Sequence, residues 1–105
     1  MVSHILVASY TNDIVTLTFD SLNSTLEKTC SLTVGTHPSW ITSHPSQPQV
    51  VWTGLEQANG KILALSHDSD GKLSLLSKTS SLGDDPCSLL VTTEEILVAN
   101  VRCIQ

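Results

Sequence analysis

Short apolar runs alternate with polar turns along the whole chain, and this pattern predicts β-strands rather than helices. Within residues 13–20 successive side chains would lie on opposite faces of a strand, with Ile14, Thr16 and Thr18 on one face and Val15, Leu17 and Phe19 on the other. The uninterrupted apolar runs 5–8 and 96–99 are typical of strands buried on both faces. No segment keeps a helical period over several turns, so we expect an all-β fold.

Three of these runs are copies of one another. They begin at Ile5, Val50 and Ile96, at nearly equal spacing, and a proline element recurs at Pro38 and Pro86. Asn-Gly and Asp-Gly pairs at 59–60 and 70–71 supply the positive φ angles of tight hairpins. The repeated unit is therefore four short strands in about 45 residues, which is the period of a β-propeller blade.

The repeats divide the chain into one incomplete blade, one complete blade and the start of a third. If the four strands of a blade are lettered a to d, residues 5–35 supply b, c and d, residues 36–83 a full blade, and residues 84–105 a and b. We expect a single all-β domain over residues 1–105, with about nine antiparallel strands. A closed propeller needs at least four blades, so sheet edges and one blade face stay open. The simplest way to cover them is a second copy related by twofold symmetry, which gives a homodimer; a monomeric two-sheet β-sandwich is the alternative.

Composition narrows the choice of partner and compartment. Ser and Thr number 27, whereas charged residues make up only 14% of the chain, with five basic and ten acidic side chains and a net charge of −5. This balance argues against nucleic acid and against an anionic membrane surface. The three cysteines (Cys30, Cys87 and Cys103) fit neither a disulfide framework nor a zinc site, and no cofactor or metal is expected. The first residues lack the pattern of a secretion signal, so we expect a cytoplasmic protein, with non-classical release as the alternative.

Four segments (36–45, 52–56, 85–88 and 98–100) resemble the lactonase-type, 6-phosphogluconolactonase-like family of seven-bladed propellers, and its fungal members in particular. The resemblance runs from about residue 5 to 100 and covers only the N-terminal third of a family member. It implies hydrolysis of a sugar lactone, in which water attacks the ring carbonyl. By matched position Glu56 is the first catalytic candidate and Asn100 the second. The family often has a histidine where this chain has Ser88, and most of the blades that would complete the pocket are absent.

Three possibilities remain open after these observations. We expect a small non-catalytic β-protein that acts by binding and self-association, with Trp40, Trp52 and Cys103 as interface candidates, and with an immunomodulatory role of a fungal protein as one form of it. For Trp40 and Trp52 the ordinary role, packing together in the core, is the alternative to an interface. Lactone hydrolysis, residual or rebuilt by oligomerisation, is the alternative, and a fragment without a selected role is a third possibility.

Overall fold

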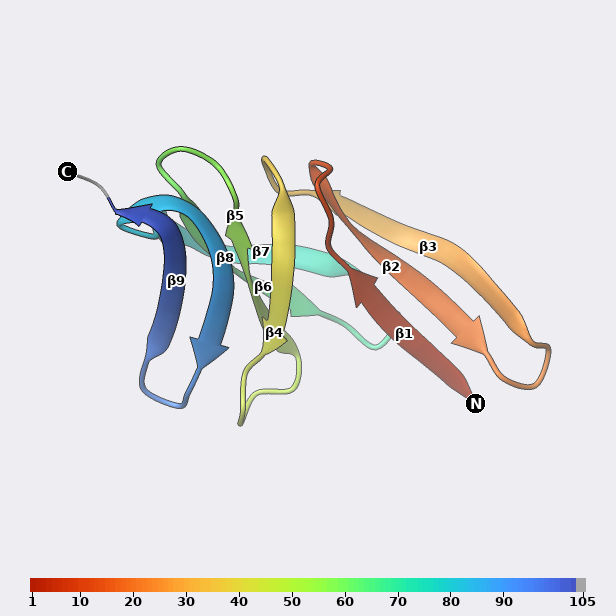
Figure 1. Cartoon of the computed structure of the whole chain (residues 1–105). Coiled ribbons are helices and arrows are strands. Elements are labelled where there is room, and N and C mark those ends of the chain that lie inside the picture. The colour runs from red at the N-terminus through yellow and green to blue at the C-terminus, as the bar shows by residue number, and fades with distance from the viewer. Residues whose placement is uncertain (104–105) are drawn as a thin grey trace.

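The computed structural model describes residues 1–103 and contains strands and turns but no helix, which confirms the all-β prediction. Nine antiparallel strands form three small sheets, ordered β1-β2-β3, β4-β5-β6-β7 and β8-β9 (Figure 1). The strands are β1 (Val2–Val7), β2 (Asp13–Asp20), β3 (Thr25–Thr33), β4 (Pro38–Ser43), β5 (Val50–Leu55), β6 (Lys61–His67), β7 (Leu73–Ser80), β8 (Gly83–Val91) and β9 (Ile96–Cys103). Within the described part of the chain, nothing qualifies as a helical membrane span.

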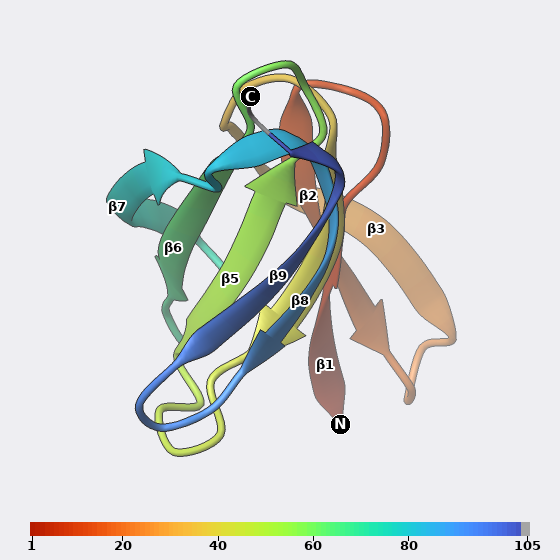
Figure 2. The ribbon, with the colours of Figure 1, turned by 60° about the vertical axis from the view of Figure 1, so that its left-hand side comes forward.

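The three sheets follow one another along the longest dimension of the molecule, as Figures 1 and 2 show. The principal extents are 52, 28 and 18 Å, and the radius of gyration is 14.3 Å. A compact domain of this length would have a radius of gyration of about 13 Å. The molecule is therefore elongated, and the first and last sheets each have one large face that no other sheet covers.

Paired irregularities show that the repeat extends to the backbone. The β2–β3 pair has a register shift between Thr16 and Leu17, and the β6–β7 pair has one at the equivalent point of the next blade, between Ala64 and Leu65. The β4–β5 pair shifts after Pro38, and the β8–β9 pair shifts after Pro86, the matching proline of the repeat. Because a bulge fixes the local bend and twist of a sheet, the three sheets bend in the same way at matching positions.

The connection into each innermost strand is also repeated. His37 and Asp85, which precede the two prolines, have φ angles of 52° and 54°. The His37 N–H donates to the carbonyl of Thr11 at 3.0 Å, and the Asp85 N–H donates to the carbonyl of Gln57 at 2.9 Å. Each of these bonds joins the start of a sheet to the loop between two strands of the preceding sheet, so it sets the position of one sheet relative to the next.

The main core lies between the first and second sheets. Ile14 of β2 packs in one cluster with Leu63 and Leu65 of β6, and all three side chains are fully buried. Thr16 is buried beside them, and its hydroxyl donates to the Gly71 carbonyl at 2.7 Å, which ties the first sheet to the β6–β7 turn. That turn is a hairpin held by the Asp68 carboxylate, which accepts from the backbone N–H groups of Asp70 and Lys72.

The expectation that the runs 5–8 and 96–99 are buried on both faces was wrong. Ile5 and Val7 of β1 are 44% and 38% exposed, and Leu97 of β9 is 53% exposed, so the runs 5–8 and 96–99 are not buried on both faces. The alternation in β2 was predicted correctly, but its less apolar face, with Ile14 and Thr16, is the buried one. The physical reason is the position of these strands in the outermost sheets, where only one face meets a neighbouring sheet.

Candidate functional site

A polar cluster lies at one end of the sheets, where the loops that follow β1 and β5 meet the starts of β4 and β8 (Figure 1). Glu56 comes directly after β5, and its backbone N–H donates to the His37 carbonyl at 3.0 Å. Tyr10, in the β1–β2 loop, meets the His37 ring edge to face, with centroids 5.2 Å apart and an interplanar angle of 83°. Glu56, the first catalytic candidate, is therefore grouped with Tyr10 and His37 from three separate connections.

Tyr10 and Glu56 interact electrostatically. Hydrogen bonding to the Glu56 carboxylate, followed by the negative charge of that carboxylate, raises the pKa of the Tyr10 hydroxyl above its ordinary value of 10.0. The charge of Asp85 acts in the same direction. Tyr10 therefore stays protonated at neutral pH and can donate a proton in a hydrogen bond, whereas Glu56 can accept one.

A basic side chain at this end of the sheets is already engaged. Arg102 of β9 contacts the Asp85 carboxylate at 3.2 Å in the one ion pair found among residues 1–103. Because both partners are partly exposed, the pair contributes little to stability. The cluster keeps the negative charge of Glu56 without a paired cation in the described structure, which makes it a poor site for an anionic group.

Asn100, the second catalytic candidate, holds a turn in place. Its side-chain NH₂ donates to the Ser81 carbonyl at 3.0 Å, and its amide packs so closely on Gly83 that a Cβ there would lie 2.7 Å from it. The buried Oδ1 atom has no hydrogen-bond partner among the described residues. The amide thus anchors the β7–β8 connection, and a catalytic role for Asn100 stays a prediction.

Trp40 and Trp52 lie between the second sheet and the β8–β9 hairpin. The Trp40 indole N–H donates to the Leu89 carbonyl of β8 at 3.2 Å, although the side chain is 42% exposed. Trp52 is half-buried and lines a cavity of about 330 Å³ with His44 and the residues of the β8–β9 turn. The two indoles therefore join parts of this chain, and their role in an interface between chains stays a prediction.

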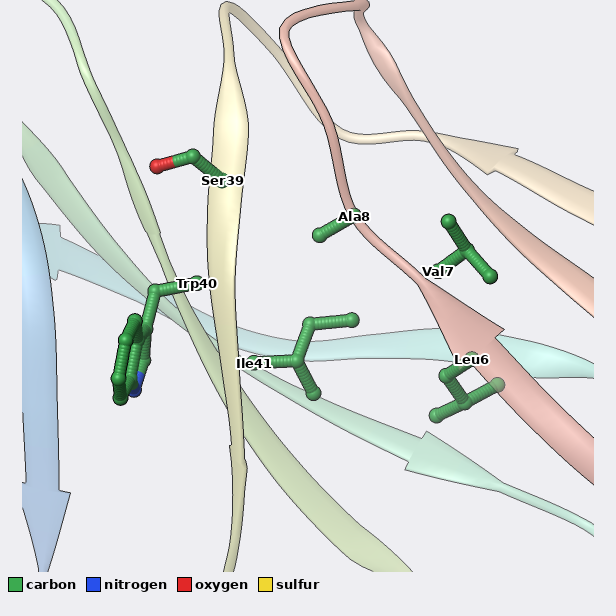
Figure 3. Close-up of a pocket in the computed structure, with 6 residues that line it drawn as sticks. All are labelled: Leu6, Val7, Ala8, Ser39, Trp40 and Ile41. Carbon is green, nitrogen blue, oxygen red and sulfur yellow. The ribbon is translucent and has the colours of Figure 1, made fainter.

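A second cavity, of about 370 Å³, separates the open edge of β1 from β4. Figure 3 shows Ile41 pointing from β4 toward Leu6 of β1, while Trp40 points to the opposite side of β4. β5 of the second sheet has β4 along its inner edge, whereas no strand among residues 1–103 lies along the corresponding edge of β1. The unpaired backbone of β1 therefore borders an open groove with apolar side chains.

The cysteines add no assembled site. Cys30 and Cys87 are free and half-buried. Cys103, the third interface candidate, ends β9 opposite Gly83, but its side chain lies outside the described residues, so its place in an interface stays a prediction. No grouping of His, Cys, Asp and Glu suited to a metal ion occurs within residues 1–103.

Tyr10 and His37 were not predicted as members of the site. The sequence pattern indicates for His37 only an ordinary polar residue at a strand end, and it singles out Tyr10 for no role. The repeat nevertheless contains a usable signal, because Tyr10 and Glu56 each follow the second strand of their own blade. Residues at equivalent loop positions of neighbouring blades lie at the same end of the sheets, so their proximity could have been expected.

Comparison with known proteins agrees with this architecture. The family model described as "Lactonase, 7-bladed beta-propeller" matches residues 4–102. A search of curated proteins gives no significant match.

Two solved structures are similar over 90% of the chain. One is a putative 6-phosphogluconolactonase from Bacteroides uniformis, with a TM-score of 0.78 and 24% identity. The other is a putative 6-phosphogluconolactonase from Bacteroides fragilis, with a TM-score of 0.79 and 25% identity. The chain spans only 29% and 28% of these proteins, so it corresponds to about two blades of a seven-bladed ring. Both neighbours are bacterial, and the fungal affinity stays a prediction.

Proposed function

Since the chain belongs to the lactonase family of seven-bladed β-propellers, we propose that it is a non-catalytic member that acts by binding and self-association, with a homodimer as its basic form. The observation that carries this proposal is the uncovered apolar face of the first sheet. Six apolar side chains share that face through the register of β1, β2 and β3: Ile5, Val7, Val15, Leu17, Phe19 and Leu26. Ile5, Val7, Phe19 and Leu26 are exposed. Contiguous apolar surface of this kind marks interaction sites.

The open edge of β1 supports the same proposal. Its unpaired N–H and C=O groups can form hydrogen bonds with a strand of another chain. The side chains beside this edge, from Leu6 to Ala8 and from Ser39 to Ile41, leave space for such a strand. Pairing of this edge and burial of the neighbouring apolar face would both stabilise the contact between two copies.

The charges of the polar cluster argue against catalysis on a phosphorylated sugar. Glu56 and Asp85 both bear negative charge there, and the one nearby arginine, Arg102, is engaged with Asp85. A phosphate group carries up to two negative charges, so its approach to this end of the sheets would be repelled.

The mass in solution tests self-association directly. Light scattering on a size-exclusion column, in the presence of reductant, should give twice the 11.3 kDa of the single chain. A dimer that dissociates only when reductant is added would instead assign the association to a disulfide such as one through Cys103. A monomer over the whole accessible concentration range, with and without reductant, would refute the proposal.

Lactone hydrolysis is the second candidate, and the grouping of Glu56 with Tyr10 and His37 favours it. Glu56 would accept a proton from the attacking water, and the hydroxide would add to the lactone carbonyl. The ring C–O bond would then break, with the proton returned to the ring oxygen, and the product would be the open sugar acid. The two similar solved structures bear the name of such an activity, as putative 6-phosphogluconolactonases.

The rate of hydrolysis of 6-phosphogluconolactone decides between the two candidates. Under the non-catalytic proposal the wild-type chain and Glu56→Gln both match the spontaneous rate. A wild-type rate above the spontaneous one that is lost in Glu56→Gln, but kept in Glu95→Gln in the distant β8–β9 turn, would establish the hydrolase instead.

An immunomodulatory role is the most specific form of the binding proposal and rests on the size and open surfaces of the chain alone. It predicts that endotoxin-free protein stimulates cultured immune cells. No response at micromolar concentration would exclude it. The proposal also holds that neither nucleic acid nor a membrane is a partner, because the net charge is −5. The proposed location of the protein is the cytoplasm, with non-classical release as the alternative.

A further inference from the structure

Each sheet of this chain has an N-side face, turned toward the part of the chain that precedes it, and a C-side face, turned toward the part that follows. The N-side face of the first sheet carries the six apolar side chains that β1, β2 and β3 share: Ile5, Val7, Val15, Leu17, Phe19 and Leu26. The C-side face of the β8–β9 hairpin is a second uncovered apolar set, formed by Leu90, Leu97, Ala99 and Val101. Leu90, Leu97 and Val101 are 59%, 53% and 65% exposed. The two faces belong to the first and last sheets, which lie at the two ends of the molecule (Figure 1).

Both kinds of face are already buried against each other inside the chain. Val15 and Leu17 of the first sheet correspond to Leu63 and Leu65 of the second, which occupy the same positions beside the matching bulge. Leu63 and Leu65 are fully buried, because the C-side face of the first sheet covers them. The N-side face of the first sheet therefore has the same construction as a face that forms the centre of the core.

The C-side face of the hairpin has an internal counterpart as well. Ser88 and Leu90 follow Pro86 at the same intervals at which Trp40 and Thr42 follow Pro38. Trp40 packs toward the next sheet, where its indole N–H reaches the Leu89 carbonyl. A C-side face thus packs on the N-side face that follows it at two places within the chain, and one face of each kind is left over at the two ends.

We propose that copies of this chain associate head to tail, with the C-side face of β8–β9 of one copy packed on the N-side face of β1–β3 of the next. This proposal rests on the self-association proposed above and specifies its geometry. A second copy is the occupant that the structure favours, because it brings the complementary face with the same repeat-encoded twist and bulges. On the N-side face Lys28 lies opposite Leu17, and Asp13, two positions before Val15, is the one carboxylate of β1–β3 on that side; it already accepts from the Thr33 hydroxyl at 2.7 Å.

The geometry distinguishes this arrangement from a twofold dimer. In a twofold contact the same patch is used by both copies, so the other uncovered face plays no part. In a head-to-tail contact the two copies use different patches, and the assembly keeps one free face of each kind at its ends. The head-to-tail dimer can therefore add further copies, and oligomers larger than the dimer should form only as the protein concentration rises further.

A pair of complementary variants tests the proposal. Phe19→Lys places a charge on the N-side face, and Leu97→Lys places one on the C-side face; Leu22→Lys, in the exposed β2–β3 turn, is the control. Each face variant alone should be monomeric, with its self-association dissociation constant raised by more than about tenfold, as expected for a charge buried in an apolar contact. At about 0.15 M ionic strength, where the added charge is screened, Leu22→Lys should associate like the wild type.

Mixing the two face variants gives the decisive result. Phe19→Lys retains an intact C-side face and Leu97→Lys an intact N-side face, so an equimolar mixture should form a 1:1 heterodimer, identified by its mass in native mass spectrometry. Two monomers in the mixture, or one variant that still dimerises like the wild type, would overturn the head-to-tail geometry while leaving self-association intact. A wild-type monomer at every concentration would overturn both proposals. If circular dichroism shows that a variant has lost its strands, Leu26→Lys and Leu90→Lys, which are more exposed, replace the pair.

Discussion

At the scale of single residues, Gly60 is required by a close approach between two sheets. A Cβ atom at this position would lie 2.6 Å from the Ser81 hydroxyl and would also collide with the ring of the buried Pro86. The Gly60 N–H donates to the Gly83 carbonyl, and the Ser81 N–H donates to the Gly60 carbonyl, both at 2.8 Å. The backbone therefore has no freedom to move away from an added methyl group.

We expect Gly60→Ala to lower the free energy of unfolding by about 1–3 kcal/mol, the usual cost of overpacking a closely packed site. Urea denaturation followed by circular dichroism measures it. The neighbouring Asn59→Gly is the matched control: Asn59 has a φ of 53°, which glycine adopts freely, so this change should cost less than about 0.5 kcal/mol. Equal effects of the two substitutions would show that the close approach is not what constrains this turn.

The Tyr10–Glu56 pair can be observed without interference, because the chain contains one tyrosine. The hydrogen bond to Glu56 and its negative charge raise the pKa of Tyr10, since ionised Tyr10 would lose the bond and face a second negative charge. We expect Glu56→Gln to lower this pKa toward 10.0, as measured by ultraviolet absorbance during alkaline titration.

Glu95→Gln provides the control for this titration. It removes the same charge from the β8–β9 turn, which is distant from Tyr10, and should leave the titration midpoint unchanged. A midpoint that also stays unchanged in Glu56→Gln would mean that the polar cluster does not form in solution as described.

At the scale of the elements, one buried hydroxyl connects two sheets. The Thr16 side chain of β2 is fully buried and donates to the Gly71 carbonyl in the β6–β7 turn. We expect Thr16→Val, which keeps the shape but removes the donor, to lower the free energy of unfolding by about 1–3 kcal/mol, because the carbonyl loses its partner in a buried position. Thr79→Val, at an exposed position of β7, should change it by less than about 0.5 kcal/mol. Chemical denaturation of both variants checks the difference, and equal losses would contradict it.

The strands themselves were largely predictable, and burial was not. The alternation of residues 13–20 predicts the two faces of β2 correctly, because the side-chain period of a strand is fixed by its geometry. The more apolar face, with Val15, Leu17 and Phe19, was the natural candidate for the core, yet Ile14 and Thr16 are buried. The order of the sheets decides which face is covered, and no local pattern contains that information.

The candidate site was also predictable from the sequence only in part. Glu56 could be assigned from the sequence because it lies in a segment that resembles a known family. Its neighbours Tyr10 and His37 come from two other loops, far from it in sequence, and they meet only when two sheets pack side by side. Asn100 also matched by position, but its hydrogen bond to Ser81 depends on the turn that precedes β8.

At the scale of the whole molecule, the apolar faces of the first and last sheets favour association of copies, whereas the negative charge of every copy opposes it. Every copy has a net charge of −5, so association brings like charges together while it buries apolar surface. Salt screens the repulsion, since the Debye length falls from about 30 Å at 0.01 M to about 8 Å at 0.15 M ionic strength. Raising sodium chloride over this range should therefore strengthen self-association, which sedimentation velocity measures.

Two variants of one exposed residue separate charge repulsion from other effects of salt. Leu22 is 87% exposed in the β2–β3 turn and belongs to neither end face. Leu22→Lys changes the net charge from −5 to −4, and Leu22→Glu changes it from −5 to −6. At low salt the lysine variant should associate more tightly than the glutamate variant, and at about 0.15 M the two should converge because the added charges are then screened. If association of the wild type instead weakens as salt is added, ion pairs between copies hold the assembly, and the apolar end faces are not its main source of affinity.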